Sequence, residues 1–291
     1  MRLALAQFAI PDRGEAAFDR VASAVASGAS NGADLVALPE LCTLPYFPAE
    51  PLPEMFDLAE PIPGPTSERL GEIARRSGVA LNTTLFERVA AGLYANTSAL
   101  FDRTGRLVAT YRKAHIPDDP GFGEKYYFTP GDEPCVVATL ETEAGSARVG
   151  LLVCWDQWYP EAARLAALRG AELLLYPTAI GWSPDEVEEH AAQHDAWRTA
   201  HRGHAIANGV YVAASNRVGV ERGTDFWGGS LVAGPDGRVL GEMSHRDEGV
   251  LVLEIDRAAI ERQRRVWPFL RDRRIELYGG LTRRWLGEGE R

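Results

Sequence analysis

The sequence predicts an α/β fold in which β-sheets are covered by helices within one domain. Short β-rich runs alternate with helical patterns along most of the chain, and both strand meanders and strand–helix units occur. The 291 residues suit one large α/β domain or two small ones. No low-complexity linker, composition break or repeat of fixed period divides the chain, so we expect a single domain.

The first half of the chain predicts strand–helix units followed by a meander. Apolar runs of four to eight residues indicate strands, and apolar positions that recur every three to four residues indicate helices. A turn at Thr104-Gly105 separates the last two strands of the meander. The expected elements are a strand at Leu3–Ile10, a helix at Glu15–Ser27, a strand at Ala33–Leu38, a helix at Thr66–Arg76 and strands at Val79–Leu85, Thr97–Asp102 and Leu107–Arg112.

The second half predicts further strand–helix units. Gly170 and the pair Asn208-Gly209 end two helical patterns, as glycine commonly does after a last helical turn. The expected elements are a strand at Val149–Val153, a helix at Glu161–Arg169, a strand at Glu172–Tyr176, a helix at Pro184–Asn208 and strands at Val210–Ser215, Gly229–Ala233 and Gly249–Ile255.

The last segment of the chain differs from the rest. Residues 1–256 account for the expected sheets, whereas residues 257–291 are rich in arginine and carry Trp267, Phe269 and Tyr278 with no evident place in a sheet. We expect this C-terminal extension to pack on a partner subunit; the alternative is that it lies on its own domain.

Composition narrows the class of partner. The formal net charge is −10, and an acidic surface repels phosphate backbones, so nucleic acid is not an expected partner, whereas a cationic small molecule is attracted. The start of the chain lacks the pattern of a signal peptide, and no apolar run reaches the roughly 20 residues of a membrane helix. Three widely spaced cysteines do not make a disulfide framework. We therefore expect a cytoplasmic protein with free thiols and no membrane partner.

Cys154 lies where a buried strand ends and a helix is about to begin. Pro160 follows near the first helical position, which proline favours. A strand-to-helix turn exposes a side chain and directs backbone N–H groups toward it, and such donors favour both a thiolate and a developing oxyanion. Cys154 is thus a candidate nucleophile; the alternative is a buried, inert cysteine, because a free cysteine packs like a small apolar residue. Cys42 and Cys135 lack this setting, and we expect them to pack.

Glu40 and Lys113 also follow apolar strands. Each residue alone is typical of a surface charge, but catalytic groups gather at strand ends of open α/β sheets, and a nucleophile, a base and a cation form a chemically coherent set.

These segments resemble the three signature motifs of the nitrilase (carbon–nitrogen hydrolase) superfamily. Leu38-Pro39-Glu40 resembles its glutamate motif, Tyr111-Arg-Lys113-Ala-His115 its lysine motif, and Val153-Cys154-Trp-Asp156 with Pro160-Glu161 its cysteine motif. The likeness runs in the family's order from Leu3 to about Asp256. It implies a four-layer αββα sandwich, no metal or cofactor, and homo-oligomers built from dimers.

Longer stretches are similar to the N-carbamoylputrescine amidases. They are Lys113–Gly131, Cys154–Arg164, Tyr176–Gly181 and Asn216–Gly219. In that branch a second glutamate, matched by Glu124, completes a Glu–Lys–Glu–Cys constellation. The resemblance implies hydrolysis of a ureido C–N bond, which would place the enzyme in putrescine and polyamine biosynthesis. The segment Leu41–Phe47 departs from the branch and leaves the exact substrate open.

The substrate pocket has its own candidate residues. We expect four residues to bind or enclose the substrate. We also expect an acid to pair with a cationic substrate tail, because a buried charge needs a partner. The pocket candidates are Trp155, Tyr46, Ala179 and Trp182, and the candidate acids are Asp195 and Glu50.

Three other functions remain open at this point. The first is an amidase for another N-carbamoyl amine, an N-carbamoyl amino acid or an aliphatic amide. The second is a metal-dependent hydrolase, since His190, His194 and His201 share one face of the expected helix and His-x₃-His is a zinc spacing. The third is a binding protein on the same scaffold, although such a protein is expected to lose motif residues that are all present here.

Overall fold

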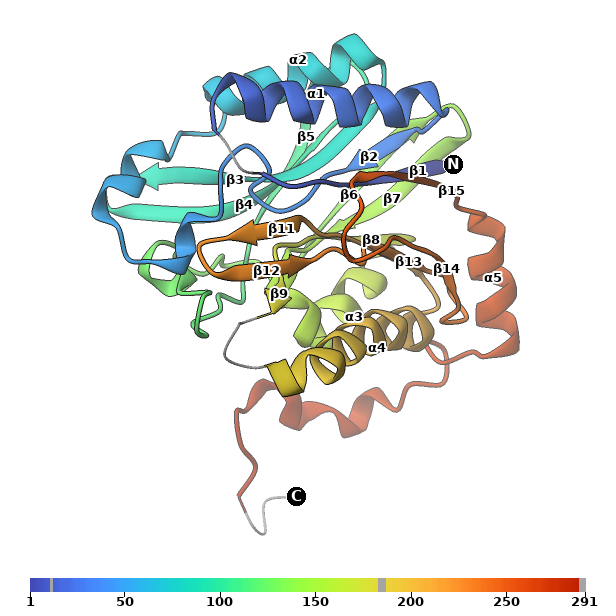
Figure 1. Cartoon of the computed structure of the whole chain (residues 1–291). Coiled ribbons are helices and arrows are strands. Elements are labelled where there is room, and N and C mark those ends of the chain that lie inside the picture. The colour runs from blue at the N-terminus through green and yellow to red at the C-terminus, as the bar shows by residue number, and fades with distance from the viewer. Residues whose placement is uncertain (11–12, 183–186, 288–291) are drawn as a thin grey trace.

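Two β-sheets lie face to face between two layers of helices. The structure, a computed structural model, describes residues 1–10, 13–182 and 187–287. Helices α1 (Glu15–Ser30) and α2 (Pro65–Ser77) cover one sheet, and α3 (Pro160–Leu168) and α4 (His190–Asn208) cover the other (Figure 1). The predicted four-layer αββα sandwich is confirmed.

The first sheet has six strands in the order β15-β1-β2-β3-β4-β5. Strands β1, β2 and β3 are parallel, whereas β3, β4 and β5 form an antiparallel meander and β15 pairs antiparallel with β1. The first and last strands of the described chain are thus hydrogen-bonded neighbours. The strand bounds are β1 (Arg2–Gln7), β2 (Leu35–Ala37), β3 (Ala80–Ala90), β4 (Leu93–Phe101), β5 (Leu107–Arg112) and β15 (Gly249–Glu254).

The second sheet repeats this plan in the order β14-β13-β10-β8-β7-β6. Its central strands β7, β8 and β10 are parallel, and the strands on either side are antiparallel. The bounds are β6 (Val136–Thr142), β7 (Gly145–Leu151), β8 (Leu173–Pro177), β10 (Tyr211–Ser215), β13 (Leu231–Ala233) and β14 (Val239–Glu242). A smaller sheet in the order β11-β12-β9 consists of β9 (Gly181–Trp182), β11 (Val218–Glu221) and β12 (Thr224–Trp227).

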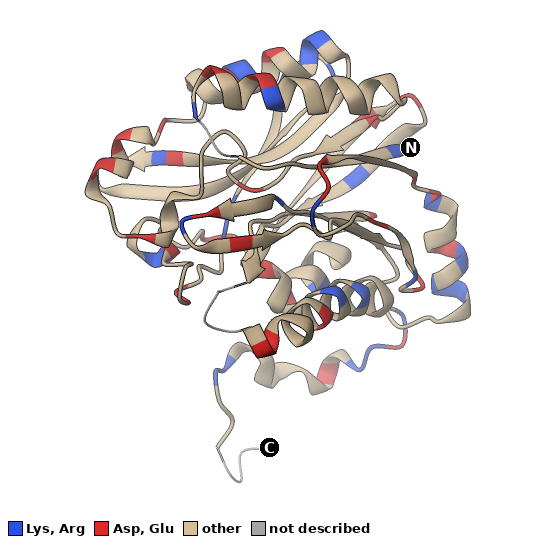
Figure 2. Ribbon diagram, in the orientation of Figure 1, with Lys and Arg blue, Asp and Glu red and all other residues tan. Residues whose placement is uncertain are grey.

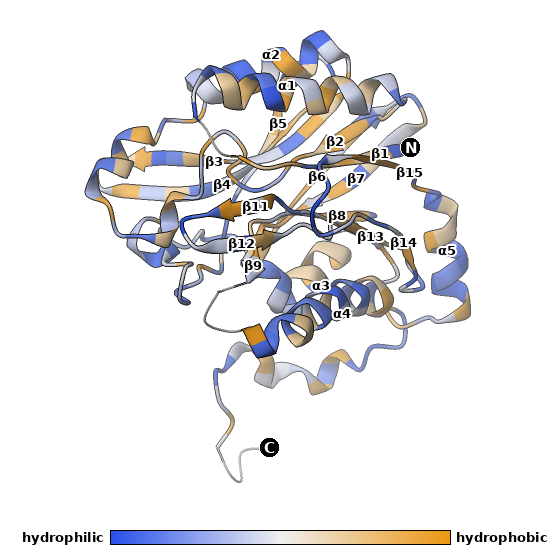
Figure 3. Ribbon diagram, in the orientation of Figure 1, coloured by the Kyte–Doolittle hydropathy of each residue, from blue (hydrophilic) through white to orange (hydrophobic). Residues whose placement is uncertain are grey.

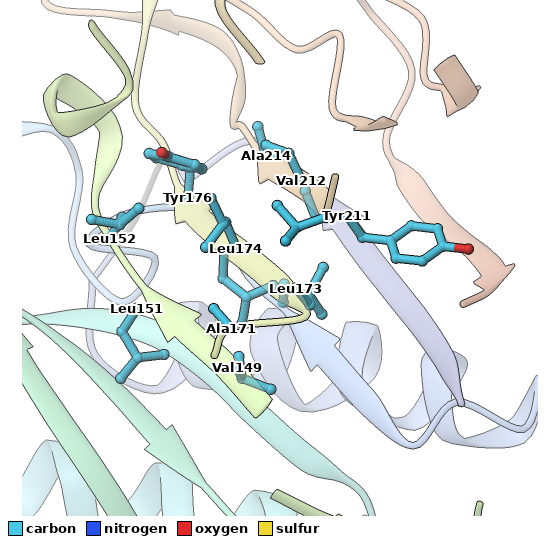
Figure 4. Close-up of a cluster of buried hydrophobic side chains, with 14 of the residues drawn as sticks. Val149, Leu151, Leu152, Ala171, Leu173, Leu174, Tyr176, Tyr211, Val212 and Ala214 are labelled. Atoms are coloured by element: carbon cyan, nitrogen blue, oxygen red, sulfur yellow. The ribbon is translucent and has the colours of Figure 1, made fainter. Parts of the chain in front are cut away.

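Strand β1 shows why both faces of the first sheet are buried. Leu3 and Leu5 belong to the core between the two sheets, whereas the alternate residues Ala4 and Ala6 belong to the core beneath α1 and α2. All four are fully buried, as side chains of alternating direction between two covering layers must be. The apolar side chains of the second sheet form a continuous cluster along β7, β8 and β10 (Figure 4).

The distribution of polarity follows the layers. Apolar residues colour the strands inside the sandwich (Figure 3), and most charged residues lie on the helices, the loops and the C-terminal segment (Figure 2). Among the residues that the structure describes, no helix combines the length and the apolarity needed to cross a lipid bilayer.

The observed helices and strands differ from the predicted ones at the starts of strands and in the second half of the chain. Strand β4 begins at Leu93, four residues before the predicted strand, because its first residues pair with the exposed end of β3. Strands β6, β11, β12 and β14 were not predicted; they are edge or hairpin strands with exposed or mixed polarity. The predicted helix Pro184–Asn208 is α4 from His190 onward, and its positions 184–186 lie outside the described residues. A further helix, α5 (Arg257–Val266), lies within the C-terminal extension.

Candidate active site

Polar residues gather where parallel strands of both sheets end. Glu40 follows β2 in one sheet, and Cys154 and Thr178 follow β7 and β8 in the other. The Glu40 N–H donates a hydrogen bond to the Thr178 carbonyl at 3.2 Å, which joins the two sheets at this edge. The carboxyl ends of parallel strands are the usual location of sites in α/β sheets.

Lys113 lies between two carboxylates in the interior. Its Nζ is 2.9 Å from Glu40 Oε1 and 2.7 Å from Glu124 Oε2, and all three side chains are essentially unexposed. Burial lowers the pKa of Lys113, but Glu124 and Glu40 outweigh it and raise this pKa above the ordinary lysine value. The lysine therefore stays charged at neutral pH.

The two carboxylates have different surroundings. Glu40 Oε1 also accepts a hydrogen bond from Asn96 Nδ2 at 2.7 Å, whereas Glu40 Oε2 has no hydrogen-bond partner among the described residues. Glu124 Oε1 accepts from the Tyr46 hydroxyl at 2.8 Å. Burial raises the pKa of Glu124 to about 7, against the opposing effect of Lys113. One carboxylate is thus fully engaged, and the other has an oxygen available for a proton.

Cys154 lies on a strained turn. Its φ is +38°, a left-handed conformation that few residues other than glycine adopt, and it begins the 3₁₀ turn Cys154–Trp158 between β7 and α3. Asp156 braces the turn, because its Oδ2 accepts from the Val153 N–H at 2.9 Å. Pro160 is the first residue of α3, as predicted. Strain of this kind persists only where neighbouring contacts hold it and is common at functional sites.

The Cys154 thiol is buried beside the two carboxylates and the lysine. Burial raises its pKa well above the ordinary value; Glu40 raises it further, and Lys113 lowers it. Its Sγ lies 3.8 Å from the Ala179 carbonyl oxygen. At neutral pH the sulfur is consequently protonated, so nucleophilic attack requires a base. Cys42 and Cys135 are also buried free thiols, and burial raises the pKa of Cys42 to about 11.

Asp156 connects the lysine segment to the cysteine turn. It is fully buried, and it accepts from the Tyr111 hydroxyl at 2.8 Å and from the His115 N–H at 3.1 Å. The same carboxylate therefore fixes residues on both sides of Lys113 and the turn that carries Cys154. Sequence reasoning assigned no role to Asp156, although its place two residues after Cys154 was a signal.

Arg217 holds the segment that follows Glu40. Its guanidinium is fully buried and donates to the Glu40 carbonyl at 2.6 Å and to Glu221 at 2.9 Å. Glu221 in turn accepts from the Tyr46 N–H at 2.6 Å, and Tyr46 reaches Glu124. A fully buried arginine is rare without such partners. The sequence offered no signal that this arginine is buried, and Asn96 was missed because the predicted strand began one residue after it.

A cavity of about 370 Å³ opens next to Cys154. Its described lining includes apolar and aromatic walls, two acids and no lysine or arginine. The lining residues are Pro117, Asp119, Pro120, Phe122, Glu124, Cys154, Trp155, Trp158, Ala179, Ile180, Gly181, Gln193, Ala196 and Trp227. A cavity of this size suits a small molecule.

The structure brings some of the expected pocket residues together and not others. Trp155 and Ala179 line the cavity, and Tyr46 lies behind it against Glu124. Trp182 packs on Trp227, with ring centroids 5.7 Å apart, but is not among the described lining residues. Asp195 is exposed and is not among them either, because it lies on a solvent-facing side of α4. Glu50, the other candidate acid, forms an exposed ion pair with Arg222.

The helix histidines do not converge on a common point. His201 is fully buried, with Nδ1 2.8 Å from the Trp197 carbonyl oxygen, and His190 stacks on Trp182. Within residues 1–10, 13–182 and 187–287, no group of three or more His, Cys, Asp or Glu side chains is arranged to hold a metal ion. The geometry thus gives no support to a metal site formed by His190, His194 and His201.

Comparison with known proteins shows the family. The family described as Carbon-nitrogen hydrolase matches residues 2–265, and the chain therefore belongs to this family. It is 41% identical over 256 residues to the N-carbamoylputrescine amidase of Solanum lycopersicum, covering 85% of this chain and 83% of that protein. It is 36% identical over 290 residues to the citrullinase of Francisella tularensis, covering 98% of this chain and 99% of that protein.

Solved structures of carbon–nitrogen hydrolases and amidases superpose on this chain, in agreement with the family assignment. A carbon-nitrogen hydrolase from Helicobacter pylori G27 superposes with a TM-score of 0.93 at 41% identity, covering 98% of this chain and 99% of that chain. A mutant of the amidase from Nesterenkonia sp. AN1, with the acetamide moiety of fluoroacetamide covalently added at its active site cysteine, gives a TM-score of 0.74 at 32% identity, covering 98% of this chain and 97% of that chain. The predicted superfamily membership is confirmed, and the chain is a hydrolase of carbon–nitrogen bonds other than peptide bonds.

Proposed function

We propose that this protein hydrolyses the ureido C–N bond of N-carbamoylputrescine, with Cys154 as nucleophile, Glu40 as proton carrier, Lys113 as oxyanion stabiliser and Glu124 as the residue that orients Lys113. The observation that carries the proposal is the buried Glu40–Lys113–Glu124 arrangement beside Cys154 at the cavity. Support for the cysteine also comes from the Nesterenkonia amidase, whose active site cysteine carries the covalent adduct.

The reaction starts with removal of the thiol proton. Because burial keeps the Cys154 thiol protonated, Glu40 takes this proton through Oε2, which has no hydrogen-bond partner among the described residues, while Sγ attacks the ureido carbonyl carbon. Negative charge grows on the carbonyl oxygen, and the Lys113 ammonium and the Trp155 N–H stabilise it. The protonated Glu40 then gives its proton to the leaving nitrogen, and ammonia departs.

The second half of the reaction returns the free enzyme. An N-alkylcarbamoyl thioester remains on Cys154, and Glu40 takes a proton from the water that attacks it. The C–S bond breaks, the thiol regains a proton from Glu40, and the released carbamate loses carbon dioxide to give the amine. The products are one amine, one carbon dioxide and one ammonia per substrate and water, and no metal or cofactor enters these steps.

The lining of the cavity favours a cationic substrate tail. N-Carbamoylputrescine and citrulline share a ureido group and an ammonium, but citrulline also carries a carboxylate. The described lining offers carboxylates and no lysine or arginine for such a group. A charge left unpaired at a desolvated site costs about 3 kcal/mol, which corresponds to about 100-fold in kcat/KM.

An ammonia-release assay over a substrate panel tests the proposed function. We expect kcat/KM for N-carbamoylputrescine to exceed that for citrulline, N-carbamoyl-β-alanine and short aliphatic amides by about 100-fold. A higher value for citrulline would establish the second candidate function, which the full-length similarity to a citrullinase favours. A higher value for an N-carbamoyl acid or a simple amide would reject the cationic-tail proposal while leaving the Cys154 chemistry intact.

We also propose that residues 257–291 dock on a second copy of the chain, in a homo-oligomer built from dimers. The segment runs across α3 and α4 of its own chain (Figure 1) and forms a cavity with them. It nevertheless leaves large apolar side chains in solvent, with Val266 71% and Trp285 80% exposed. Large apolar side chains exposed to this extent within one segment are typical of an interaction surface.

Truncation after Asp256 tests the role of the extension. We expect assemblies of the truncated protein to contain fewer copies of the chain than those of the full-length protein, as measured by light scattering, because the apolar docking surface is lost. Substitution of exposed Trp285 and Leu281 by serine in the full chain is the milder matched variant, and we expect it to weaken the assembly in the same direction. An unchanged number of copies per assembly for both proteins would contradict the proposal.

A further inference from the structure

The buried asparagine Asn96, on strand β4, contacts two members of the candidate site. Its side-chain Nδ2 donates to Glu40 Oε1 at 2.7 Å, and its main-chain carbonyl accepts from the Lys113 N–H at 2.9 Å. The side chain is fully buried. The amide must present its nitrogen to Glu40, because an amide oxygen and a carboxylate oxygen are both acceptors. A residue without charge therefore holds one oxygen of the Glu40 carboxylate.

Both donors that reach the Glu40 carboxylate bind the same oxygen. Oε1 accepts from Asn96 at 2.7 Å and from Lys113 Nζ at 2.9 Å, whereas Oε2 has no hydrogen-bond partner among the described residues. Glu124 differs, because one of its oxygens accepts from Lys113 and the other from Tyr46. Of these two carboxylates, Glu40 is thus the one that keeps an oxygen for a proton within the part of the chain that the structure describes.

The hydrogen bond from Asn96 limits rotation of the Glu40 carboxylate. The last torsion of a glutamate side chain has a broad energy minimum, and an ammonium attracts both carboxylate oxygens. With Lys113 as its only donor, the carboxylate could turn Oε2 toward the ammonium as well. A second donor on Oε1, held by a different strand, opposes this rotation. The thiol is near, since Glu40 raises the pKa of Cys154 further after the larger effect of burial.

We propose that Asn96 is a positioning residue, which holds Glu40 Oε1 so that Oε2 stays available for the Cys154 proton. This inference rests on the proposed function in one respect, that Glu40 is the base; it does not depend on the identity of the substrate. Asn96 is not among the described residues that line the cavity. Its loss should therefore slow removal of the thiol proton without weakening substrate binding.

The neighbouring strand β3 supplies a matched control, Asn82. It is as fully buried as Asn96, and in both residues Oδ1 has no hydrogen-bond partner among the described residues. Its Nδ2 donates to Ser98 Oγ at 3.0 Å and to the Ala99 carbonyl at 3.1 Å rather than to Glu40. Leucine has a similar branched shape without polar atoms. Asn82→Leu consequently removes a buried amide from the same sheet, as Asn96→Leu does, and leaves the Glu40 carboxylate held.

The first measurement is the rate at which iodoacetamide alkylates Cys154, followed by intact-protein mass and peptide mapping. The sulfur displaces iodide while the thiol proton passes to Glu40, so the rate reports proton removal without the natural substrate. We expect Asn96→Leu to lower this rate about 10- to 100-fold, the range for a hydrogen bond to a charged group, and Asn82→Leu to leave it within about threefold.

A second variant, Asn96→Asp, keeps the shape of the side chain. It places an acceptor oxygen against Glu40 in place of the donor, and two adjacent carboxylates favour a shared proton. Glu40 is then less able to take the proton of Cys154. We expect alkylation to slow at least as much as in Asn96→Leu. Rates equal to wild type in both Asn96 variants, or an equal loss in Asn82→Leu, would overturn the positioning role.

Turnover of N-carbamoylputrescine supplies the second measurement. We expect Asn96→Leu to lower kcat by the same factor as the alkylation rate and to leave KM within about twofold of the wild-type value, because binding is not affected. A rise in KM at constant kcat would contradict the positioning role. A wild-type enzyme that does not hydrolyse N-carbamoylputrescine, but whose Cys154 alkylation still depends on Asn96, would overturn the proposed substrate alone.

Discussion

Cys154→Ala is expected to lower kcat by about 10⁶-fold, the size of the loss when a catalytic nucleophile is removed from a hydrolase. The reason is that the sulfur forms the covalent bond on which both halves of the proposed reaction depend. The substitution removes one buried sulfur atom, so the protein should remain folded. Steady-state ammonia release with N-carbamoylputrescine, together with a thermal melt, measures both effects.

The other two cysteines supply matched controls. Cys42 and Cys135 are buried like Cys154, but Cys42 Sγ is hydrogen-bonded to Thr83 Oγ1 at 3.1 Å, and neither sulfur lines the cavity. We expect Cys42→Ala and Cys135→Ala to retain activity within about tenfold. Full activity in Cys154→Ala, or a complete loss in Cys135→Ala alone, would show that the nucleophile has been misassigned.

Lys113→Met is expected to lower kcat by about 100- to 1000-fold and also to destabilise the fold. The loss of rate follows from removal of one oxyanion donor. The loss of stability follows because Glu40 and Glu124 remain buried without their shared cation, and breaking a buried ion pair costs about 3–5 kcal/mol. Ammonia-release kinetics and urea denaturation measure the two effects separately.

A second substitution distinguishes the chemical role of Lys113 from its structural role. In Lys113→Met combined with Glu124→Gln, one of the two unpaired carboxylates is removed, so part of the lost stability should return. Activity should not return, because the oxyanion donor is still missing. Recovery of kcat together with stability would mean that Lys113 only supports the fold.

The sequence predicted which residues gather at the candidate site better than it predicted the walls of the cavity. Glu40, Lys113 and Cys154 were selected because each follows an apolar strand and belongs to a recognisable motif, and the structure brings the three side chains together. Burial of the Glu40–Lys113–Glu124 group could not be derived from spacing, since lysine and glutamate are usually exposed. In the structure all three side chains are fully buried.

The missed or misplaced residues share a physical cause. Arg217 and Asp156 act through contacts with chain segments that are remote in sequence; Arg217 and Glu40, for example, are 177 positions apart. Asp195 was chosen as an acceptor by its place on a helix, but a helical pattern does not say which side faces a cavity formed by loops.

The most direct test of the central claim is mass spectrometry of the acid-quenched enzyme during turnover of N-carbamoylputrescine, followed by peptide mapping. The proposed mechanism predicts a protein species heavier by the mass of the substrate less ammonia, located on the peptide that contains Cys154 and absent from Cys154→Ala. An adduct on Cys42 or Cys135, or steady turnover by Cys154→Ala, would contradict the account.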